Sequence, residues 1–425
     1  MKNLLFLLIT FFLLTGCQEK NKVSENNDAD NLLVFGKIDS IQSEVLNESR
    51  KIWIHVPGDG DQNIFSGKKY PVLYLLDGPG HFYSVAGMMK QLSTANGNAL
   101  IPEMVIVAIP NTNRTRDLTP THSDISPFGG DTAWLKDSGG GEAFTDFLEK
   151  ELIPYIDQNY PVTSYRTYVG HSFGGLAVIN TLMTRPDLFD NYISIDPSMW
   201  WNNQETLQMT KEKLSEVDFS DRSLFVGVAN TLPEGMDVDM ARKDTSSDTY
   251  HYRSIMEFVD AASAEEVNGL AMNWKYYSED DHGSVPLITE YDAFREMFSW
   301  YRFEEIQKFY DPSYQMEPAE MRGIIESHYE KISDRFGYSV LPDEMFVNSL
   351  GYGFMNDGKL ALSEAAFDLN IQNYPESFNV YDSKGDYYMA AKDSLKALEL
   401  FQKAVEISPN EFSQEKIDML QSNMN

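Results

Sequence analysis

A serine flanked by glycines is the part of this sequence best suited to chemistry. Residues 170–175 read Gly-His-Ser-Phe-Gly-Gly and contain G-x-S-x-G, which is typical of a sharp strand-to-helix turn that exposes a serine hydroxyl. The β-branched and aromatic run 166–169 precedes it, and the apolar run 176–183 has a helical pattern. In so tight a turn, a side chain at either flanking glycine would collide with neighbouring backbone. The pattern predicts that Ser172 is a nucleophile.

A serine hydroxyl is a poor nucleophile until a base removes its proton, so one of the seven histidines must reach Ser172. His282 follows a strand-like run and precedes a helix, and it comes after the serine in the chain, as expected for a base beside this kind of turn. We expect His282 to be the base. His251 and His328 fall on charged helical stretches. His81 follows a strand end and is expected to line the substrate pocket.

The base needs a carboxylate to orient its imidazole, and this acid is expected between the serine and the histidine in the chain. The loop after the strand-like run 223–228 offers Glu234, Asp237 and Asp239. We expect Glu234 to be the acid, with Asp237 as the main alternative. Three more acidic residues at 279–281 directly precede the base. We interpret them as a solvated turn, because adjacent side chains in one loop rarely point correctly.

Attack by a serine on a carbonyl group also needs two hydrogen-bond donors for the oxyanion that forms. The backbone N–H of Phe173, one residue after the serine, is the expected first donor. The second is expected from the loop that follows the strand-like run 70–76. Pro79 in this loop has no N–H, so the sequence leaves Gly78 or Gly80 as the second donor.

Strand-like and helical runs alternate over residues 31–305. Continuous apolar runs at 70–76 and 104–109 suit a parallel sheet that is covered on both faces, and helical patterns such as 142–158 lie between strands. The other strand-like runs are 32–35, 50–56, 192–195, 223–228 and 273–277. These patterns predict one doubly wound α/β domain over 31–305, with a surface loop at 120–141 near the site.

These motifs together resemble the putative-esterase family of α/β-hydrolases. That family includes siderophore (enterochelin) esterases, feruloyl and acetyl-xylan esterases, S-formylglutathione hydrolases and mycolyltransferases. The resemblance rests on residues 75–78, 170–175, 195–201 and 281–284. It implies an α/β-hydrolase fold with a mostly parallel sheet and an ester or acyl substrate. The motifs are specific for the superfamily and much less so for the substrate.

The resemblance also implies residues that contact the substrate. Trp200 and Trp201 fall where the family lines its acyl or aryl pocket, and ordinary core packing is the equal alternative. Arg114 and Arg116 lie at the exit of a strand, where they would suit an anionic substrate. An ion pair with Asp117 in the same loop is the favoured alternative for these arginines.

The N-terminus has the features of an export signal. Residues 1–16 combine a lysine with an apolar run of the length of a secretory signal peptide rather than a membrane span. Leu14-Thr-Gly-Cys resembles the lipobox of bacterial lipoproteins, which implies cleavage before Cys17 and a lipid on that cysteine. Cys17 is the only cysteine, so no disulfide is expected. Residues 17–30 are polar and would tether the chain to the bacterial cell envelope, with Gln18 favouring the outer membrane.

The pattern of the sequence changes after residue 305. The motif at 349–352 recurs at 383–386, and the offset of 34 residues is the period of tetratricopeptide repeats. We expect a helical linker over 306–340 and a small all-α domain of tetratricopeptide-like repeats over 341–425. Such repeats would offer a surface for a protein partner or a substrate chain.

The formal charge of −31 excludes a role on nucleic acid, whose phosphates would be repelled. No cluster of histidine and acidic residues has metal-ligand spacing in the sequence, so no metal or other cofactor is expected. We therefore expect a serine esterase that forms an acyl-enzyme on a siderophore, feruloyl, acetyl or related ester. Two alternatives stay open: acyl transfer to a sugar or alcohol by the same residues, and a non-catalytic lipoprotein scaffold that recruits partners.

Overall fold

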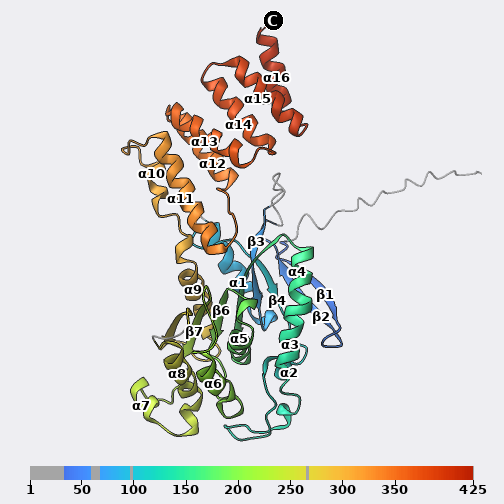
Figure 1. Ribbon diagram of the computed structural model, residues 1–425, viewed down its shortest axis with the longest axis vertical. Helices are drawn as coiled ribbons and strands as arrows, with labels where there is room; N and C mark the ends of the chain where they lie inside the picture. The colour runs from blue at the N-terminus through green and yellow to red at the C-terminus, as the bar shows by residue number, and fades with distance from the viewer. Residues whose placement is uncertain (1–32, 59–67, 96–98, 265–267, 425) are drawn as a thin grey trace, which may run out of the picture. The chain divides into compact units, whose positions relative to one another are not determined.

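The computed structural model describes residues 33–58, 68–95, 99–264 and 268–424, and residues 36–425 form one compact unit. Over the described residues, the α/β part of this unit is built around an eight-stranded sheet with the order β1-β2-β4-β3-β5-β6-β7-β8 (Figure 1). The strands are β1 (Lys37–Ser43), β2 (Glu48–His55), β3 (Tyr70–Leu75), β4 (Val105–Ala108), β5 (Val162–His171), β6 (Asn191–Ile195), β7 (Ser223–Ala229) and β8 (Ala271–Tyr277).

The sheet is antiparallel from β1 through β2 to β4 and parallel across the remaining strands. Every residue of β3 and of β4 is buried, as their continuous apolar sequences require of strands covered on both faces. The predicted α/β-hydrolase fold is confirmed. The strand-like run 32–35 was a wrong prediction: its described residues 33–35 have no regular structure, and the first strand is the polar edge strand β1.

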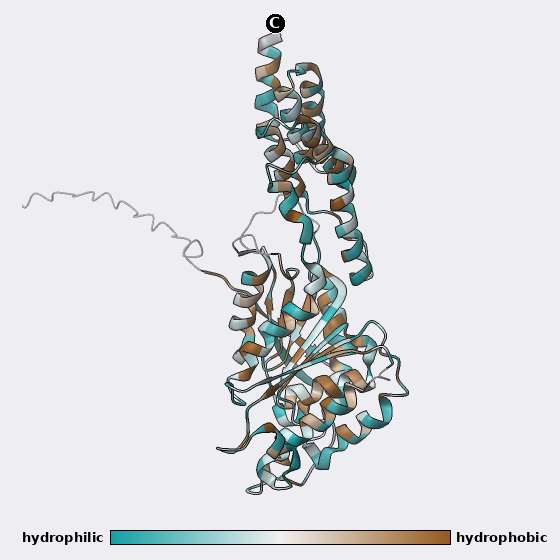
Figure 2. Cartoon of the chain, turned by 90° about the vertical axis from the view of Figure 1, so that its left-hand side faces the viewer, coloured by the Kyte–Doolittle hydropathy of each residue, from teal (hydrophilic) through white to brown (hydrophobic). Residues whose placement is uncertain are grey.

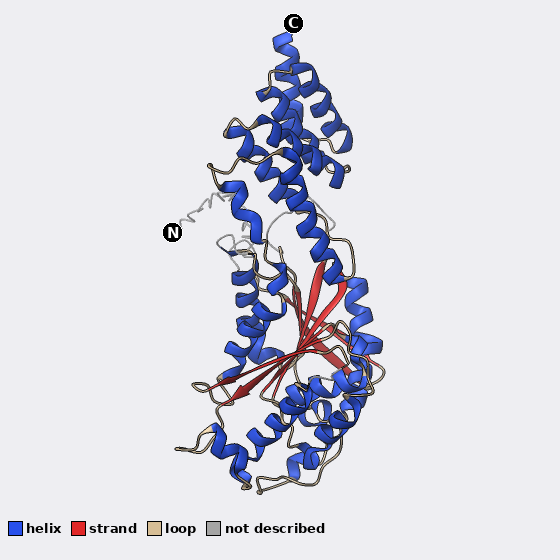
Figure 3. Ribbon diagram, turned by 60° about the vertical axis from the view of Figure 1, so that its left-hand side comes forward, coloured by secondary structure: helices blue, strands red, loops and turns tan. Residues whose placement is uncertain are grey.

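Helices cover both faces of the sheet, as Figure 3 shows for the strands in red and the helices in blue. One core cluster contains side chains of α1 (Gly78–Ser93), α9 (Val285–Met297) and α11 (Pro318–Phe336). The other contains side chains of α3 (Gly141–Phe147), α4 (Ile153–Asn159), α5 (Phe173–Thr184), α6 (Trp201–Lys213) and α8 (Tyr250–Ala262). The short helices α2 (Arg114–Leu118) and α7 (Val238–Lys243) lie in loops. Polar and apolar residues share each helix in Figure 2, as expected of helices with one buried face.

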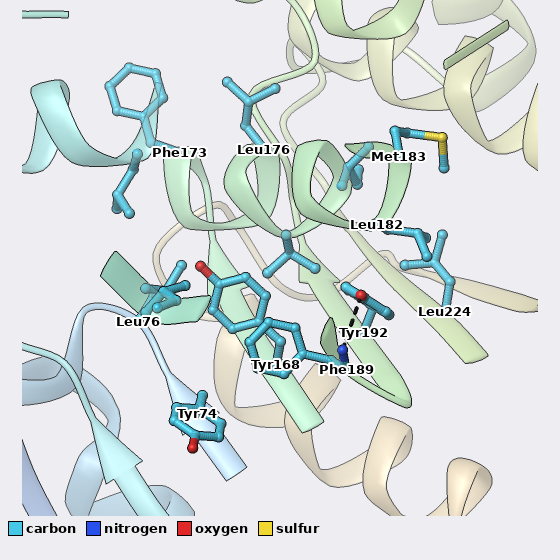
Figure 4. Close-up of a cluster of buried hydrophobic side chains, with 14 of the residues drawn as sticks. Tyr74, Leu76, Tyr168, Phe173, Leu176, Leu182, Met183, Phe189, Tyr192 and Leu224 are labelled. Atoms are coloured by element: carbon cyan, nitrogen blue, oxygen red, sulfur yellow. Dashed lines mark hydrogen bonds between the residues drawn. The ribbon is translucent and has the colours of Figure 1, made fainter. Parts of the chain in front are cut away.

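The core beside α5 is aromatic. The rings of Tyr168 and Phe189 stack with centroids 4.4 Å apart and planes at 12°, and Figure 4 shows them beside the α5 side chains Leu176 and Leu182. The backbone N–H of Phe189 donates a hydrogen bond to the hydroxyl of Tyr192 at 3.3 Å. These packed rings from β5, from β6 and from the turn before β6 hold the strand end and the helix that flank Ser172 in fixed positions.

The C-terminal region is all helical in its described part. Besides α11, its α-helices are α10 (Gln307–Tyr310), α12 (Glu344–Asn356), α13 (Leu360–Asn373), α14 (Phe378–Ala390), α15 (Ser394–Ile407) and α16 (Glu411–Met424). A Cβ added to Gly351 would lie 2.6 Å from the ring of Phe367, and one added to Gly385 would lie 2.4 Å from the ring of Phe401. Both residues of this contact recur after 34 positions, so two helix pairs pack through the same close approach.

The segment 306–340 packs on the α/β core. The ring of Phe336 lies 4.9 Å from that of Tyr165 and 5.1 Å from that of Trp300, both nearly perpendicular. Ile332 of the same helix belongs to the same buried cluster. Apolar packing therefore continues across the expected boundary at residue 305.

Three sequence-based expectations fall outside the described residues: the signal peptide over 1–16, lipidation at Cys17 and the tether over 17–30. Within the part of the chain that the structure describes, no helix combines the length and the apolar character that crossing a membrane requires.

Candidate active site

The turn around Ser172 has the strained geometry that the sequence pattern predicts. β5 ends at His171, α5 begins at Phe173, and Ser172 between them has φ 61° and ψ −115°. A Cβ at Gly170 would lie 2.4 Å from the carbonyl of Gly174, so this position must be glycine. The expected collision at Gly174 itself is wrong, because a Cβ there would meet its nearest atom at 3.4 Å, an ordinary contact.

An aspartate at the end of β6 lies beside the predicted base. Nδ1 of His282 is 2.5 Å from Oδ2 of Asp196, and the backbone N–H of Ala229 donates a hydrogen bond to Oδ1 of Asp196 at 2.9 Å. The aspartate is fully buried. Burial alone would raise its pKa, but the charges and hydrogen bonds of His251 and His282 outweigh that effect and hold the pKa of Asp196 far below its usual range. Asp196 is therefore a charged acceptor for His282.

The predicted acid does not occupy this position. Glu234 is exposed in the loop after β7, and Asp237 accepts a hydrogen bond from the backbone N–H of Met240 as the N-cap of α7. The geometry thus replaces Glu234 with Asp196 as the carboxylate that orients His282. The sequence carried a usable signal, because Asp196 directly follows a strand and precedes a proline, and it lies between the serine and the histidine in the chain.

Backbone hydrogen bonds tie the serine to the segment that carries this acid. The N–H of Ser172 donates to the carbonyl of Ile195 at 2.9 Å, and the N–H of Ser198 donates to the carbonyl of Ser172 at 3.1 Å. The hydroxyl of Ser172 lies 3.4 Å from that of Ser198. Residues on both sides of Asp196 therefore fix the position of the serine.

His171, the residue before the serine, has its ring beside that of His282. Its ring centroid is 4.5 Å from that of His282, which brings His282 beside the serine turn. Burial, assisted by the neighbouring His282, lowers the pKa of His171 to about 4, so this ring is neutral at physiological pH. The neutral ring of His171 therefore places no positive charge beside His282.

Of the expected oxyanion donors, Phe173 lies beside the serine with a suitable N–H, whereas the N–H groups of Gly78 and Gly80 already have partners. Phe173 is the first residue of α5, where a backbone N–H has no partner within the helix. The N–H of Gly78 donates to the carbonyl of Ile109 at 3.1 Å, and the N–H of Gly80 donates to the carbonyl of Asp77 at 2.9 Å. Both glycine donors are therefore engaged, and the structure does not support either as the second oxyanion donor.

The two loop arginines hold the scaffold together. Arg114 donates from Nε and Nη2 to the carboxylate of Asp77 at 2.7 and 2.9 Å, and from Nη2 to the carbonyl of His171 at 3.0 Å. Arg116 pairs with Asp117 and Glu48. The favoured ion pair with Asp117 is thus confirmed for Arg116, whereas Arg114 braces the serine turn through Asp77. These contacts occupy both guanidinium groups, which argues against the alternative of binding an anionic substrate.

Aromatic side chains gather around Phe173. Trp201 is fully buried and donates from Nε1 to the carbonyl of Thr121 at 3.0 Å, so it is a core residue. Trp200 is buried less completely and meets the ring of Phe128 edge-on at 5.0 Å. Trp134 stacks on Phe173 with ring centroids 6.2 Å apart. Phe128 and Trp134 are exposed on the loop 120–141, and the sequence analysis did not single them out.

His81 lies near the serine turn as expected, with its ring centroid 6.2 Å from that of His171. Its Nδ1 is 3.6 Å from Oε1 of Glu290, a residue of α9 that the sequence analysis missed. Glu290 is only 1% exposed, and neither carboxyl oxygen has a hydrogen-bond partner. Burial raises the pKa of Glu290 to about 8, so this carboxyl group is largely protonated at neutral pH.

Among the described residues, one group of three potential ligands comes together, namely Asp196, His251 and His282, with ligand atoms within 4.8 Å of one another. Both imidazoles are at hydrogen-bond distance from the same carboxylate oxygen, 2.8 and 2.5 Å. Two ligands of a tetrahedral zinc ion would be about 3.3 Å apart. The distances therefore fit hydrogen bonds better than a metal ion.

A serine in a strained turn after β5, with an aspartate–histidine pair from β6 and the chain after β8, defines an α/β-hydrolase. The family model described as "Putative esterase" matches residues 43–243. A solved IroE-like serine hydrolase of 30% identity, 99% of which this chain covers, agrees with this match, so the chain belongs to the esterase family.

The relatives found by sequence include siderophore esterases. The chain is 36% identical over 159 residues to the ferri-bacillibactin esterase BesA of Bacillus subtilis, covering 34% of this chain and 54% of the relative. It is 30% identical over 161 residues to the siderophore enterobactin esterase of Emericella nidulans, covering 35% and 53%. The chain thus spans about half the length of these curated relatives.

Among solved structures, an IroE-like serine hydrolase from Shewanella oneidensis is 30% identical with a TM-score of 0.64, covering 79% of this chain and 99% of that chain. An uncharacterised protein from Capnocytophaga ochracea is similar in fold, with 18% identity and a TM-score of 0.53, covering 91% of this chain and 99% of that chain. Because 91% of this chain is covered, the similarity in fold to that protein extends into the C-terminal helices.

Proposed function

We propose that this protein is a serine esterase in which Ser172 is the nucleophile, His282 the general base and Asp196 the acid that orients it. The observation that carries the proposal is the 2.5 Å contact between Nδ1 of His282 and the buried carboxylate of Asp196, beside a strained serine turn. Because Asp196 is charged, Nδ1 of His282 carries a proton and Nε2 is left as the basic nitrogen.

In the proposed reaction, the hydroxyl oxygen of Ser172 attacks the ester carbonyl while Nε2 of His282 takes its proton. Asp196 stabilises the resulting imidazolium through the Nδ1–H hydrogen bond. The N–H of Phe173 and the positive end of α5 stabilise the oxyanion. His282 then gives its proton to the departing alcohol, which leaves an acyl-enzyme. A water molecule activated by the same nitrogen releases the acid and restores Ser172.

The proposed substrate is a siderophore ester. The ferri-bacillibactin and enterobactin esterases among the relatives support this class. The exposed rings of Phe128 and Trp134, which adjoin Trp200 and Phe173, offer apolar faces to an aromatic substrate.

Changing Ser172 to alanine is expected to abolish ester hydrolysis and covalent labelling by a fluorophosphonate, because the only oxygen that forms the acyl-enzyme is removed. Hydrolysis of p-nitrophenyl acetate and of enterobactin would be followed side by side, with intact-mass spectrometry for the label. The hydroxyl of Ser198 lies 3.4 Å from that of Ser172. The matched control is Ser198→Ala, which removes this neighbouring hydroxyl but keeps Ser172, and it should still be labelled. Undiminished turnover by the Ser172→Ala variant would exclude the serine mechanism.

We also propose that the chain is a lipoprotein of the bacterial envelope, anchored through Cys17, and that its C-terminal helices are tetratricopeptide-like repeats. The sequence before Cys17 and the 34-residue recurrence of the glycine–phenylalanine contacts support these assignments. In a bacterium that expresses the full chain, Cys17→Ser is expected to abolish incorporation of labelled palmitate, since the thiol that carries the lipid is lost. Unchanged labelling of this variant would place any lipid elsewhere.

A further inference from the structure

Asp196 accepts hydrogen bonds from two histidines at one carboxylate oxygen. Oδ2 lies 2.5 Å from Nδ1 of His282 and 2.8 Å from Nε2 of His251. The two imidazole rings are nearly perpendicular, at 85°, with centroids 5.4 Å apart. His251 comes from α8, an element that the proposed reaction does not otherwise use. The carboxylate is therefore held by a second histidine that is independent of the base.

The charge of Asp196 fixes the protons on both rings. A carboxylate whose pKa is far below its usual range is ionised and can only accept hydrogen bonds. Nδ1 of His282 and Nε2 of His251 must therefore both carry hydrogen. With Ala229 donating to Oδ1, Asp196 has three donors within a fully buried position.

The two histidines differ in how firmly they are held. The side chain of His282 is 42% exposed and belongs to a turn, whereas that of His251 is 15% exposed and belongs to a helix. The carbonyl of His251 also accepts a hydrogen bond from the hydroxyl of Ser254 at 2.8 Å. An ionised carboxylate with too few donors is costly when buried. His251 can supply its donor whether or not His282 is in place.

We propose that His251 is a positioning residue of the triad, which orients the carboxylate of Asp196 and takes up part of its charge through a hydrogen bond while His282 exchanges its proton. This inference rests on the proposed function. His251 does not touch the substrate in this scheme, and the effect of its hydrogen bond reaches the reaction through Asp196 and His282. Its loss should therefore lower kcat more than it changes KM.

Of the described residues, the titratable groups that contact His251 are Asp196 from the end of β6 and His282 from the turn after β8. The ion pairs that join α8 to its neighbours lie farther along the helix, between Lys211 and Glu257 and between Arg242 and Asp260. Arg253 donates hydrogen bonds to the hydroxyl of Thr249 and to the carbonyl of Ser246. The contacts of the His251 ring with titratable groups are therefore those with Asp196 and His282.

The test compares two substitutions of His251 in the full-length protein. In His251→Gln the amide N–H₂ can still donate to Asp196 but does not titrate, whereas His251→Leu removes the donor. We expect kcat for p-nitrophenyl acetate to fall about tenfold or more in the leucine variant, with KM within about twofold, and to recover to within about threefold in the glutamine variant. Arg253→Leu, on the same turn of α8 but without contact to Asp196, is the matched control and should retain the wild-type kcat.

A pH profile separates positioning from simple loss of structure. In the leucine variant the whole charge of Asp196 faces His282, which favours protonated His282. The acid limb of kcat/KM should then move to higher pH by on the order of half a unit. In the glutamine variant, the acid limb of kcat/KM should lie at nearly the same pH as in the wild type. If the leucine variant does not fold, as judged by circular dichroism, the same comparison is made between glutamine and the shorter asparagine, which cannot reach Asp196.

Three results would overturn the inference. The first is a wild-type kcat and pH profile in His251→Leu. The second is a kcat of His251→Gln as low as that of His251→Leu, and the third is an acid limb of kcat/KM that moves to lower pH in His251→Leu. The Ser172→Ala variant is assayed in parallel. Turnover without Ser172 would mean that the proposed function has failed, whereas normal fluorophosphonate labelling with an indifferent His251 would reject only the positioning role.

Discussion

Replacing Asp196 with asparagine is expected to lower kcat by about three to four orders of magnitude with little change in KM. An asparagine fits the same space, but its amide N–H₂ would favour the tautomer of His282 that carries its proton on Nε2. That tautomer cannot accept the proton of Ser172. The measurement is steady-state hydrolysis of p-nitrophenyl acetate, with circular dichroism to confirm that the variant folds.

The matched control for this experiment is Glu234→Gln. Glu234 is exposed in the loop after β7, so its neutralisation should leave kcat within about twofold of the wild type. The opposite ranking, with an active Asp196→Asn variant and an inactive Glu234→Gln variant, would return the acid to the loop after β7.

Replacing Glu290 with glutamine is expected to stabilise the protein at neutral and alkaline pH. Burial raises the pKa of Glu290 from 4.5 to about 8, so the folded state favours the protonated form. The wild-type free energy of unfolding should therefore fall as pH rises from about 4.5 to about 8, and level off above that range. Glutamine stays neutral, so the variant should gain roughly 2–5 kcal/mol over the wild type at pH 9 and little at pH 4.

Urea unfolding at pH 5, 7 and 9 measures this difference. Glu279→Gln serves as the control, because Glu279 is exposed and its stability contribution should not follow pH in this way. A difference between the Glu290→Gln variant and the wild type that stays constant across the three pH values would mean that Glu290 ionises normally in the folded state.

The strained turn around Ser172 and the core strands could be predicted because each leaves a local signature. Ser172 lies in a pattern whose glycine at 170 is required by backbone contact, and β3 and β4 are continuous apolar runs. The edge strand β1 was missed because its sequence is polar and only its last residues are buried, whereas the apolar residues just before it are exposed.

The acid and the second oxyanion donor depend on three-dimensional contacts that a sequence does not display. Asp196 has φ 42°, and its approach to His282 depends on where the turn after β8 crosses the end of β6. The N–H groups of Gly78 and Gly80 are consumed by backbone hydrogen bonds that form only when β4 lies beside β3 and α1 begins. Residue type did not single out Asp196, and it could not show that the N–H groups of both Gly78 and Gly80 are engaged.

The proposed acid Asp196 directly follows β6, so the loop after β7 is not needed to supply it. Asn230 still braces the turn of His282 through the carbonyls of Ser278 and Asp280. Beyond it, residues 233–246 carry no member of the triad. Apart from Ala241, which is fully buried, the stretch is expected to tolerate changes of charge. A randomised library confined to its exposed positions should therefore keep Ser172, Asp196 and His282 in register.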